Sequence, residues 1–206
     1  MTPEDALFAA SALCFAAFLA LGYAVCRARP LWTIDDRARE LVGRATPLAA
    51  LFTFSGRAFA LTALAIVAIA AILAVRGSLV VAAAICTVQA CSQGVGELAK
   101  RSFSRARPDD WIFHRELGFS YPSGHAATAA FFFGSWAIYA GLSTAWHAAT
   151  IVAVAALVLW IAGIDWSRLA LGAHYVTDVI GGTLFGCGWL ASSWALLLHF
   201  GAVHPK

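Results

Sequence analysis

The stretch LGFSYPSGHAATAAFFFGSWAIYAGLSTAWHAATIVAVAALVLWIAGI, residues 117–164, contains no Asp, Glu, Lys or Arg. A helix needs about 20 mostly apolar residues to cross the hydrocarbon of a bilayer. The stretch is therefore long enough for two crossings, with a turn near residues 141–144. It predicts a membrane protein whose chain crosses the bilayer more than once.

Further charge-free runs lie on both sides of this stretch, at residues 6–26, 58–75, 77–96 and 179–205. Of the 206 residues, 61% are hydrophobic and 12% are charged, against about 45–50% and about 25% in soluble domains. We therefore expect one membrane-embedded all-α domain, residues 1–206, with six transmembrane helices. A soluble domain built from very apolar core helices is disfavoured, because too few polar residues remain to cover its surface.

Residues 31–46, between the first two expected spans, have the pattern of an amphipathic helix. Thr33 followed by Asp36 resembles a capping box, which marks a helix start. Two pairs of opposite charge stand four residues apart, as neighbours on one helix face do: Asp35 with Arg39, and Glu40 with Arg44. With Trp32 as an anchor at headgroup depth, we expect an interfacial helix; a solvated helical linker is the alternative.

Two glycines in the last expected span, Gly182 and Gly186, have the spacing that lets membrane helices approach closely. We interpret this pair as a packing contact between the last span and another helix.

The first polar fragment is KRSFSRARP, residues 100–108, directly after the third expected span. Six residues separate Lys100 from Arg107, and Pro108 favours an irregular loop that can turn both cations toward one point. A guanidinium can bind two phosphate oxygens at once, whereas an ammonium acts as a point charge. Alternatively, both cations are interfacial anchors, and Lys100 pairs with Glu97.

The second fragment is PSGH, residues 122–125, at the start of the fourth expected span. Ser123 can cap that helix, and Gly124 permits close approach of the backbone to a ligand. The first amides of a helix attract anions, and His125 could then act as a proton donor. An ordinary capped helix start with an interfacial histidine is the alternative.

The third fragment is SRLALGAHYVTD, residues 167–178. His174 and Asp178 are four residues apart at the start of the last span, so the carboxylate can hold one ring nitrogen and leave the other free to attack. Arg168 precedes them by a short loop. One histidine and one aspartate are too few ligands for a metal site. A local hydrogen bond beside a snorkelling Arg168 is the alternative.

In this order, the three fragments resemble the type 2 phosphatidic acid phosphatase superfamily, whose pattern is K-x6-RP, then PSGH, then SR-x5-H-x3-D. The matching residues are Lys100, Arg107 and Pro108, then Pro122, Ser123, Gly124 and His125, then Ser167, Arg168, His174 and Asp178. The resemblance covers about residues 58–198, and six helices agree with the membrane branch of the family.

The resemblance implies hydrolysis of a lipid phosphomonoester or pyrophosphate through a phosphohistidine, with neither metal nor cofactor. His174 would be the nucleophile, Asp178 would fix its tautomer, and His125 would be the general acid. The phosphate oxygens would be held by Lys100, Arg107, Ser123, Gly124 and Arg168. The expected partners are the membrane and a phosphorylated lipid such as undecaprenyl pyrophosphate, phosphatidylglycerophosphate or phosphatidate, and nucleic acid is not among them.

Other functions compatible with these residues are a lipid phosphotransferase, an enzyme like the vanadium haloperoxidases, and a non-catalytic anion transporter or binding protein. The resemblance also implies a bacterial inner-membrane protein whose active site faces the periplasm. Most Lys and Arg residues, however, follow the first, third and fifth spans, and positively charged loops usually stay in the cytoplasm. The two indications of orientation disagree.

Overall fold

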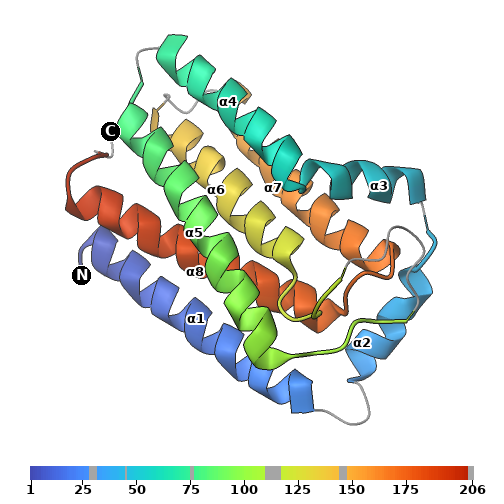
Figure 1. Ribbon diagram of the computed structural model, residues 1–206. Helices are drawn as coiled ribbons and strands as arrows, with labels where there is room; N and C mark the ends of the chain where they lie inside the picture. Colours follow the sequence, from blue (N-terminus) through green and yellow to red (C-terminus); the bar gives the residue numbers. More distant parts are fainter. Residues whose placement is uncertain (28–31, 45, 75–76, 110–116, 144–147, 204–206) are drawn as a thin grey trace.

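The computed structural model describes residues 1–27, 32–44, 46–74, 77–109, 117–143 and 148–203, and within these ranges it contains helices and no strands. The helices are α1 (Pro3–Arg27), α2 (Thr33–Arg37), the 3-10 helix η1 (Ala38–Leu41), α3 (Thr46–Ser55), α4 (Ala58–Ala74), α5 (Leu79–Phe103), α6 (Gly124–Ser143), α7 (Ala148–Ala170) and α8 (Val176–His199). Figure 1 shows the start of α1 and the end of α8 at one end of the bundle, and the ends of α5 and α7 with the starts of α6 and α8 at the opposite end. The three polar fragments therefore meet at one end of the molecule.

Four of the described helices, α1, α5, α7 and α8, are long and apolar enough to cross a membrane. Helices α3 and α4 meet this criterion only as a pair bent by 59°, which gives up to five spans. The prediction of six spans is thus confirmed only in part, because α6 is not among them. Much of α6 is buried against neighbouring helices, so it does not need the continuous apolar surface that lipid demands. Of the turn expected at residues 141–144, Gly141–Ser143 end α6 and residue 144 lies outside the described residues.

Helices α6 and α8 pack with almost no space between their backbones. A Cβ atom on Gly182 would lie 2.3 Å from the Ser123 carbonyl oxygen, and one on Gly186 would lie 2.3 Å from that of Ala127. The predicted packing role of the two glycines is confirmed. The contact places the first turn of α8 beside the first residues of α6, where the Ser123 amide donates to the Asp178 carbonyl at 3.0 Å.

Tyr121 fixes the chain just before α6. Its ring is fully buried and stacks on Phe18 of α1, with the ring centroids 5.5 Å apart. Its hydroxyl donates to the Phe18 carbonyl at 2.5 Å. Because a buried hydroxyl needs a hydrogen-bond partner, this bond holds the PSGH segment against α1.

The segment that follows α1 differs from its prediction. It forms the short helices α2 and η1, and Trp32, the N-cap residue of α2, makes no side-chain capping bond. The predicted capping box of Thr33 and Asp36 is therefore wrong. Asp35 is 1% exposed and pairs with Arg105 at 2.8 Å, because a buried carboxylate gains more from a buried guanidinium than from a solvated one on its own turn.

Candidate active site

A tight turn after α7 positions His174. Gly172 has a φ of +68°, a backbone conformation that glycine adopts without steric cost. The amides of Ala173 and His174 then both donate to the Arg168 carbonyl, at 2.9 and 3.3 Å. The turn therefore returns His174 to the end of α7 that carries Arg168.

The two ring nitrogens of His174 face groups of opposite charge. Nδ1 lies 3.5 Å from Oδ2 of Asp178, and Nε2 lies 3.1 Å from Nη1 of Arg107. A guanidinium can only donate hydrogen bonds, so Nε2 is the unprotonated nitrogen and Nδ1 carries the proton toward Asp178. The lone pair of Nε2 is thus directed at a cation that can bind phosphate.

Burial keeps the His174 imidazole neutral. The side chain is 1% exposed, and this desolvation lowers its pKa to about 4, although the nearby Asp178 carboxylate acts in the opposite direction. The cations of Arg168 and Arg107 lower the pKa further. At neutral pH the ring is therefore in the form that a nucleophile requires.

Backbone carbonyls hold Arg107 in place. Its Nε donates to the Gly118 carbonyl and its Nη1 to the Ala173 carbonyl, each at 3.2 Å. The bond to Ala173 joins the segment after α5 to the turn before α8, two parts of the chain more than 60 residues apart. The guanidinium is fixed before any ligand arrives.

A cavity of about 410 Å³ lies beside the start of α6, and Lys100, Gly124 and His125 are among its lining residues. Lys100 pairs with Glu97 at 2.6 Å, so the pairing considered from the sequence is confirmed. The Lys100 ammonium also lies at the α6 N-terminus, because a Cβ atom on Gly124 would lie 3.5 Å from its Nζ. The ammonium and the first turn of α6 both favour an anion there.

Ser123 lies between this cavity and the His174–Asp178 pair. It is fully buried, and its hydroxyl accepts a hydrogen bond from the Ala126 amide at 3.5 Å, which confirms the predicted helix cap. Its own amide holds Asp178, as described above. The first turn of α6 therefore connects the two halves of the site.

The break between α3 and α4 forms a further wall of the site. A Cβ atom on Gly56 would lie 2.8 Å from Cδ2 of His125, so only glycine lets the break come this close. Arg168 is 1% exposed and donates to the Thr53 hydroxyl of α3. A snorkelling arginine, the alternative considered from the sequence, is therefore not what the structure shows.

The predicted site residues fall into two adjoining groups. Lys100, Gly124 and His125 line the cavity, whereas His174 contacts both Arg107 and Asp178. His174 is packed against Arg107 and is not among the residues that line the cavity. Ser123 and Arg168 touch the second group through their backbones.

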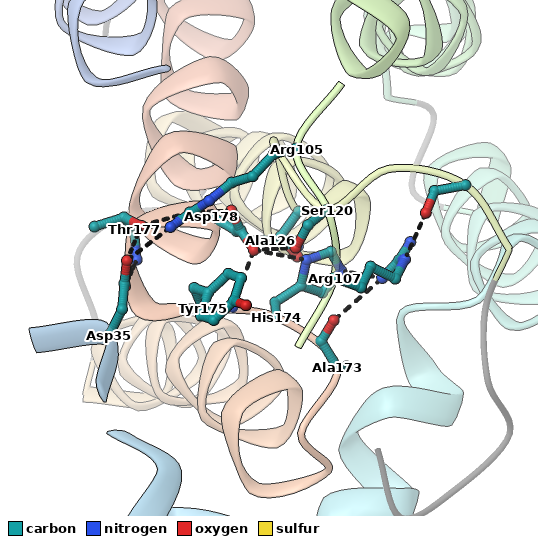
Figure 2. A network of polar contacts seen from close by, with 12 residues as sticks. Asp35, Arg105, Arg107, Ser120, Ala126, Ala173, His174, Tyr175, Thr177 and Asp178 are labelled. Atoms are coloured by element: carbon teal, nitrogen blue, oxygen red, sulfur yellow. Dashed lines mark hydrogen bonds and ion pairs between the residues drawn. The ribbon is translucent and has the colours of Figure 1, made fainter. Parts of the chain in front are cut away.

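Sequence reasoning missed several polar residues that support this site: Asp35, Thr53, Arg105, Ser120 and Thr177. Figure 2 shows Arg105 between Asp35 and Asp178, with Arg107 on the other side of His174. The segment from Lys100 to Pro108 contains four cations, of which the family pattern uses two, and this surplus could have pointed to Arg105. Asp35 had no such signal, because its partners lie 70 and 142 residues away.

The chemistry that these groups support is transfer of an anionic group. Among the described residues, no group of three or more His, Cys, Asp or Glu side chains is placed to hold a metal ion. Lys100, the capped N-terminus of α6 and His125 lie at the cavity, and His174 lies beside Arg107 in the adjoining group. A neutral imidazole backed by a carboxylate provides a nucleophile for this transfer.

Comparisons with known proteins agree with this geometry. The model of the PAP2 superfamily matches residues 77–201. Over 85 residues the chain is 36% identical to phosphatidylglycerophosphatase B of Escherichia coli (strain K12), covering 41% of this chain and 29% of that protein. Over 107 residues it is 34% identical to a lipid A 1-phosphatase of Rhizobium etli, covering 47% of this chain and 41% of that protein. The chain thus spans less than half the length of these relatives.

A solved structure extends the likeness to almost the whole fold. It is the crystal structure of a transmembrane PAP2-type phosphatidylglycerolphosphate phosphatase from Bacillus subtilis, with a TM-score of 0.79. The similarity covers 93% of this chain and 96% of that one, at 22% sequence identity. Since the three polar fragments lie in or directly beside the helices of this shared fold, and the family model spans all three, the chain belongs to the PAP2 superfamily.

Proposed function

We propose that this protein is a metal-independent lipid phosphatase of the bacterial inner membrane, with its active site facing the periplasm. The observation that carries the proposal is the state of His174, whose unprotonated Nε2 faces Arg107 while Nδ1 faces Asp178. The names of the relatives, a phosphatidylglycerophosphatase and a lipid A 1-phosphatase, support a lipid phosphate as the substrate.

The first half of the reaction forms a phosphohistidine. The lone pair of His174 Nε2 attacks phosphorus, the bond from phosphorus to the leaving oxygen breaks, and His125 protonates that oxygen. The imidazole becomes cationic, and the carboxylate of Asp178 stabilises it. The three equatorial oxygens are held by the cations of Lys100, Arg107 and Arg168, with the Ser123 hydroxyl and the Gly124 amide. Such charge stabilisation is the main contribution of proteins to phosphoryl transfer.

The second half releases phosphate. Water attacks the phosphohistidine, the bond between phosphorus and nitrogen breaks, and His125 accepts the proton of the water. Inorganic phosphate leaves, and His174 returns to its neutral form. If a lipid hydroxyl attacked in place of water, the same intermediate would make the enzyme a phosphotransferase.

The surroundings of the cavity support a substrate with a lipid tail. A second hollow of about 190 Å³ adjoins the cavity, since Ala58 and Gln93 line both. It lies between α4 and α5, and its other lining residues include Leu61, Ala90 and Phe132. A phosphate bound at the first cavity could therefore extend an apolar chain along these two helices toward the bilayer.

The test uses the purified protein in mixed micelles. Substrates are phosphatidylglycerophosphate, phosphatidate, undecaprenyl pyrophosphate and a water-soluble phosphate ester. We expect a much higher kcat/KM for the lipids, because binding of the remote tail positions the reacting phosphorus. Activity should survive EDTA, and vanadate should inhibit. Equal efficiency on the soluble ester, or a loss in EDTA that Mg²⁺ restores, would contradict the proposal.

A rapid-quench experiment with labelled phosphatidylglycerophosphate tests the intermediate. Acid-labile label should appear on the parent protein and be absent from His174→Ala. The matched control is His199→Ala, which changes an exposed histidine at the far end of α8. Labelling of His174→Ala at the parent level would contradict the assignment of the nucleophile. Analysis of the released products separates free phosphate from a phosphorylated second lipid.

A further inference from the structure

Arg105 is a buried cation that lies between two buried carboxylates. Its Nη2 lies 2.8 Å from Oδ2 of Asp35, and its Nη1 lies 2.5 Å from Oδ1 of Asp178. The Arg105 side chain is 7% exposed and both carboxylates are fully buried. Figure 2 shows the three side chains in one line that leads to His174. Burying such charges costs free energy unless each is paired. The family pattern specifies neither residue, because Arg105 stands at one of its six unspecified positions and Asp35 lies outside the three fragments.

Arg105 determines how Asp178 is oriented. It occupies Oδ1, while Oδ2 lies 3.5 Å from Nδ1 of His174. Oδ2 also accepts hydrogen bonds from the Ser120 hydroxyl and, at 2.9 Å, from the Tyr175 amide. Because Oδ1 is bound to the guanidinium, only Oδ2 is available to the imidazole. The pairing with Arg105 also holds the Asp178 side chain in the rotamer that directs Oδ2 at His174.

Asp35 is attached to both Arg105 and α8. Its Oδ2 accepts from the Thr177 hydroxyl at 2.8 Å, in addition to Arg105, and its Oδ1 accepts from the Thr177 amide at 2.9 Å. Thr177 is in the first turn of α8, where a negative charge is stabilised by the helix dipole. The segment before α3 thus supplies a fixed carboxylate to the end of the helix that carries Asp178.

The sum of the charges fits the proposed reaction. Two carboxylates and one guanidinium give this cluster a net charge of −1 before the attack. When His174 becomes cationic, the cluster and the ring together are neutral. Without Asp35, the charges of Arg105 and Asp178 would cancel, and the new imidazolium would be left without an opposing charge in a buried site, where charge–charge interactions are strong.

We propose that Arg105 and Asp35 are positioning residues of the phosphatase reaction. Arg105 directs Asp178 at His174, and Asp35 offsets the guanidinium charge so that Asp178 remains available to the imidazolium. This inference rests on the proposed function, because it concerns the same nucleophile. It gives the α2 segment a role in catalysis that a helix on the lipid surface would not have.

The experiment compares Arg105→Gln, Asp35→Asn and the double variant with the parent on phosphatidylglycerophosphate in micelles. Each single variant should lower kcat about 100-fold, the loss typical of a misplaced catalytic group, with KM changed less than about threefold. The double variant should lose no more than the worse single variant, because it restores the net charge of −1. The matched controls are Arg101→Gln and Asp36→Asn, which neutralise exposed neighbours and should keep the parent kcat.

The titration of His174 provides a second measurement, followed by NMR of labelled imidazole. Asp178 faces this ring from α8, Arg107 from the segment after α5, and Arg168 from α7. Arg105→Gln removes a nearby cation and should raise the pKa of His174, whereas Asp35→Asn should lower it. Shifts of opposite sign would show that both charges act on the imidazole, and an unchanged pKa in both variants would contradict this inference.

The outcomes separate this inference from the proposed function. If the parent releases no phosphate from any lipid, the proposed function fails. If the parent is active and Asp35→Asn keeps its kcat, the positioning role is wrong while the phosphatase assignment stands. Thermal unfolding in detergent checks each variant. Should Arg105→Gln not fold, Arg105→Lys replaces it: it keeps the charge but cannot bridge both carboxylates, and a parent-like kcat would overturn the inference.

Discussion

Replacing Asp178 by asparagine should inactivate the enzyme through the tautomer of His174. The parent carboxylate only accepts hydrogen bonds: from Arg105 at Oδ1, and from Ser120 and the Tyr175 amide at Oδ2. An asparagine has one oxygen and one amide group in these two places. The oxygen stays with Arg105, because the charged guanidinium is a stronger donor than the neutral Tyr175 amide, which loses its acceptor. The amide group is then directed at His174.

That arrangement reverses the tautomer of the His174 imidazole. An amide donor facing Nδ1 makes Nδ1 the acceptor and moves the proton to Nε2, which then has no lone pair with which to attack phosphorus. In a serine protease triad the same substitution lowers kcat about 10⁴-fold, which corresponds to about 5.5 kcal/mol in the activation free energy. We expect a loss of this size in kcat and little change in KM, because the proposed phosphate-binding residues Lys100, Arg107 and Arg168 are unchanged.

The assay is single-turnover release of labelled phosphate from phosphatidylglycerophosphate in micelles. Asp165→Asn is the matched control, because Asp165 is also a carboxylate within a helix of the bundle and also accepts a hydrogen bond, from Thr183 at 3.0 Å, but lies outside the proposed site. A kcat for Asp178→Asn within tenfold of the parent would refute the assignment of Asp178 and the tautomer argument together.

Three further predictions follow from the structure. Burial lowers the pKa of His174 to about 4, so NMR of labelled imidazole should show no protonation of this ring between pH 8 and about 5, and a titration midpoint near pH 6.5 would contradict the burial. Because the unfolded chain binds this proton more readily, the group also lowers the unfolding free energy as pH falls from about 6.5 to 4. Gly182→Ala should lower the unfolding temperature and the activity, at a cost of about 1–3 kcal/mol for overpacking, since its Cβ would lie 2.3 Å from the Ser123 carbonyl oxygen. Gly94→Ala, whose Cβ would have no neighbour within 4 Å, should lower neither, and equal stability of the two variants would disprove the close contact. Leu117→Cys, at a residue that is 94% exposed, should react with an impermeant thiol reagent in intact cells when the protein variant carries none of its native cysteines. Reaction only after lysis would place the site in the cytoplasm, as the distribution of Lys and Arg indicates.

The sequence alone was sufficient for the class of protein, because membrane insertion depends on local composition. Charge-free runs of about 20 residues identify membrane helices without knowledge of their neighbours. The number of crossings was harder to predict, because local composition does not show which helices are enclosed by others. Helix α6 is enclosed by other helices and therefore carries Gly, Ser, Thr and His among its apolar residues, so its composition reflects its neighbours rather than lipid.

The pairing of His174 with Asp178 was also predictable from their separation of four residues, although His174 precedes α8 and lies in the turn before it rather than on a face of the helix. So was the cap at Ser123, a contact between residues three apart. Short-range geometry of this kind is fixed by the backbone. The family pattern then connected these local features to a reaction that neither of them specifies alone.

Only the tertiary structure decided which residues support the proposed nucleophile, His174. Asp35, interpreted from its neighbours as half of a surface ion pair, is buried against Arg105, 70 residues away. Thr53 binds Arg168 across 115 residues. No local pattern predicts such contacts, because the residue type of a charged side chain does not tell whether it faces water or a buried partner. Packing of the bundle removes the water, and a buried charge then needs a partner from whichever helix lies nearest.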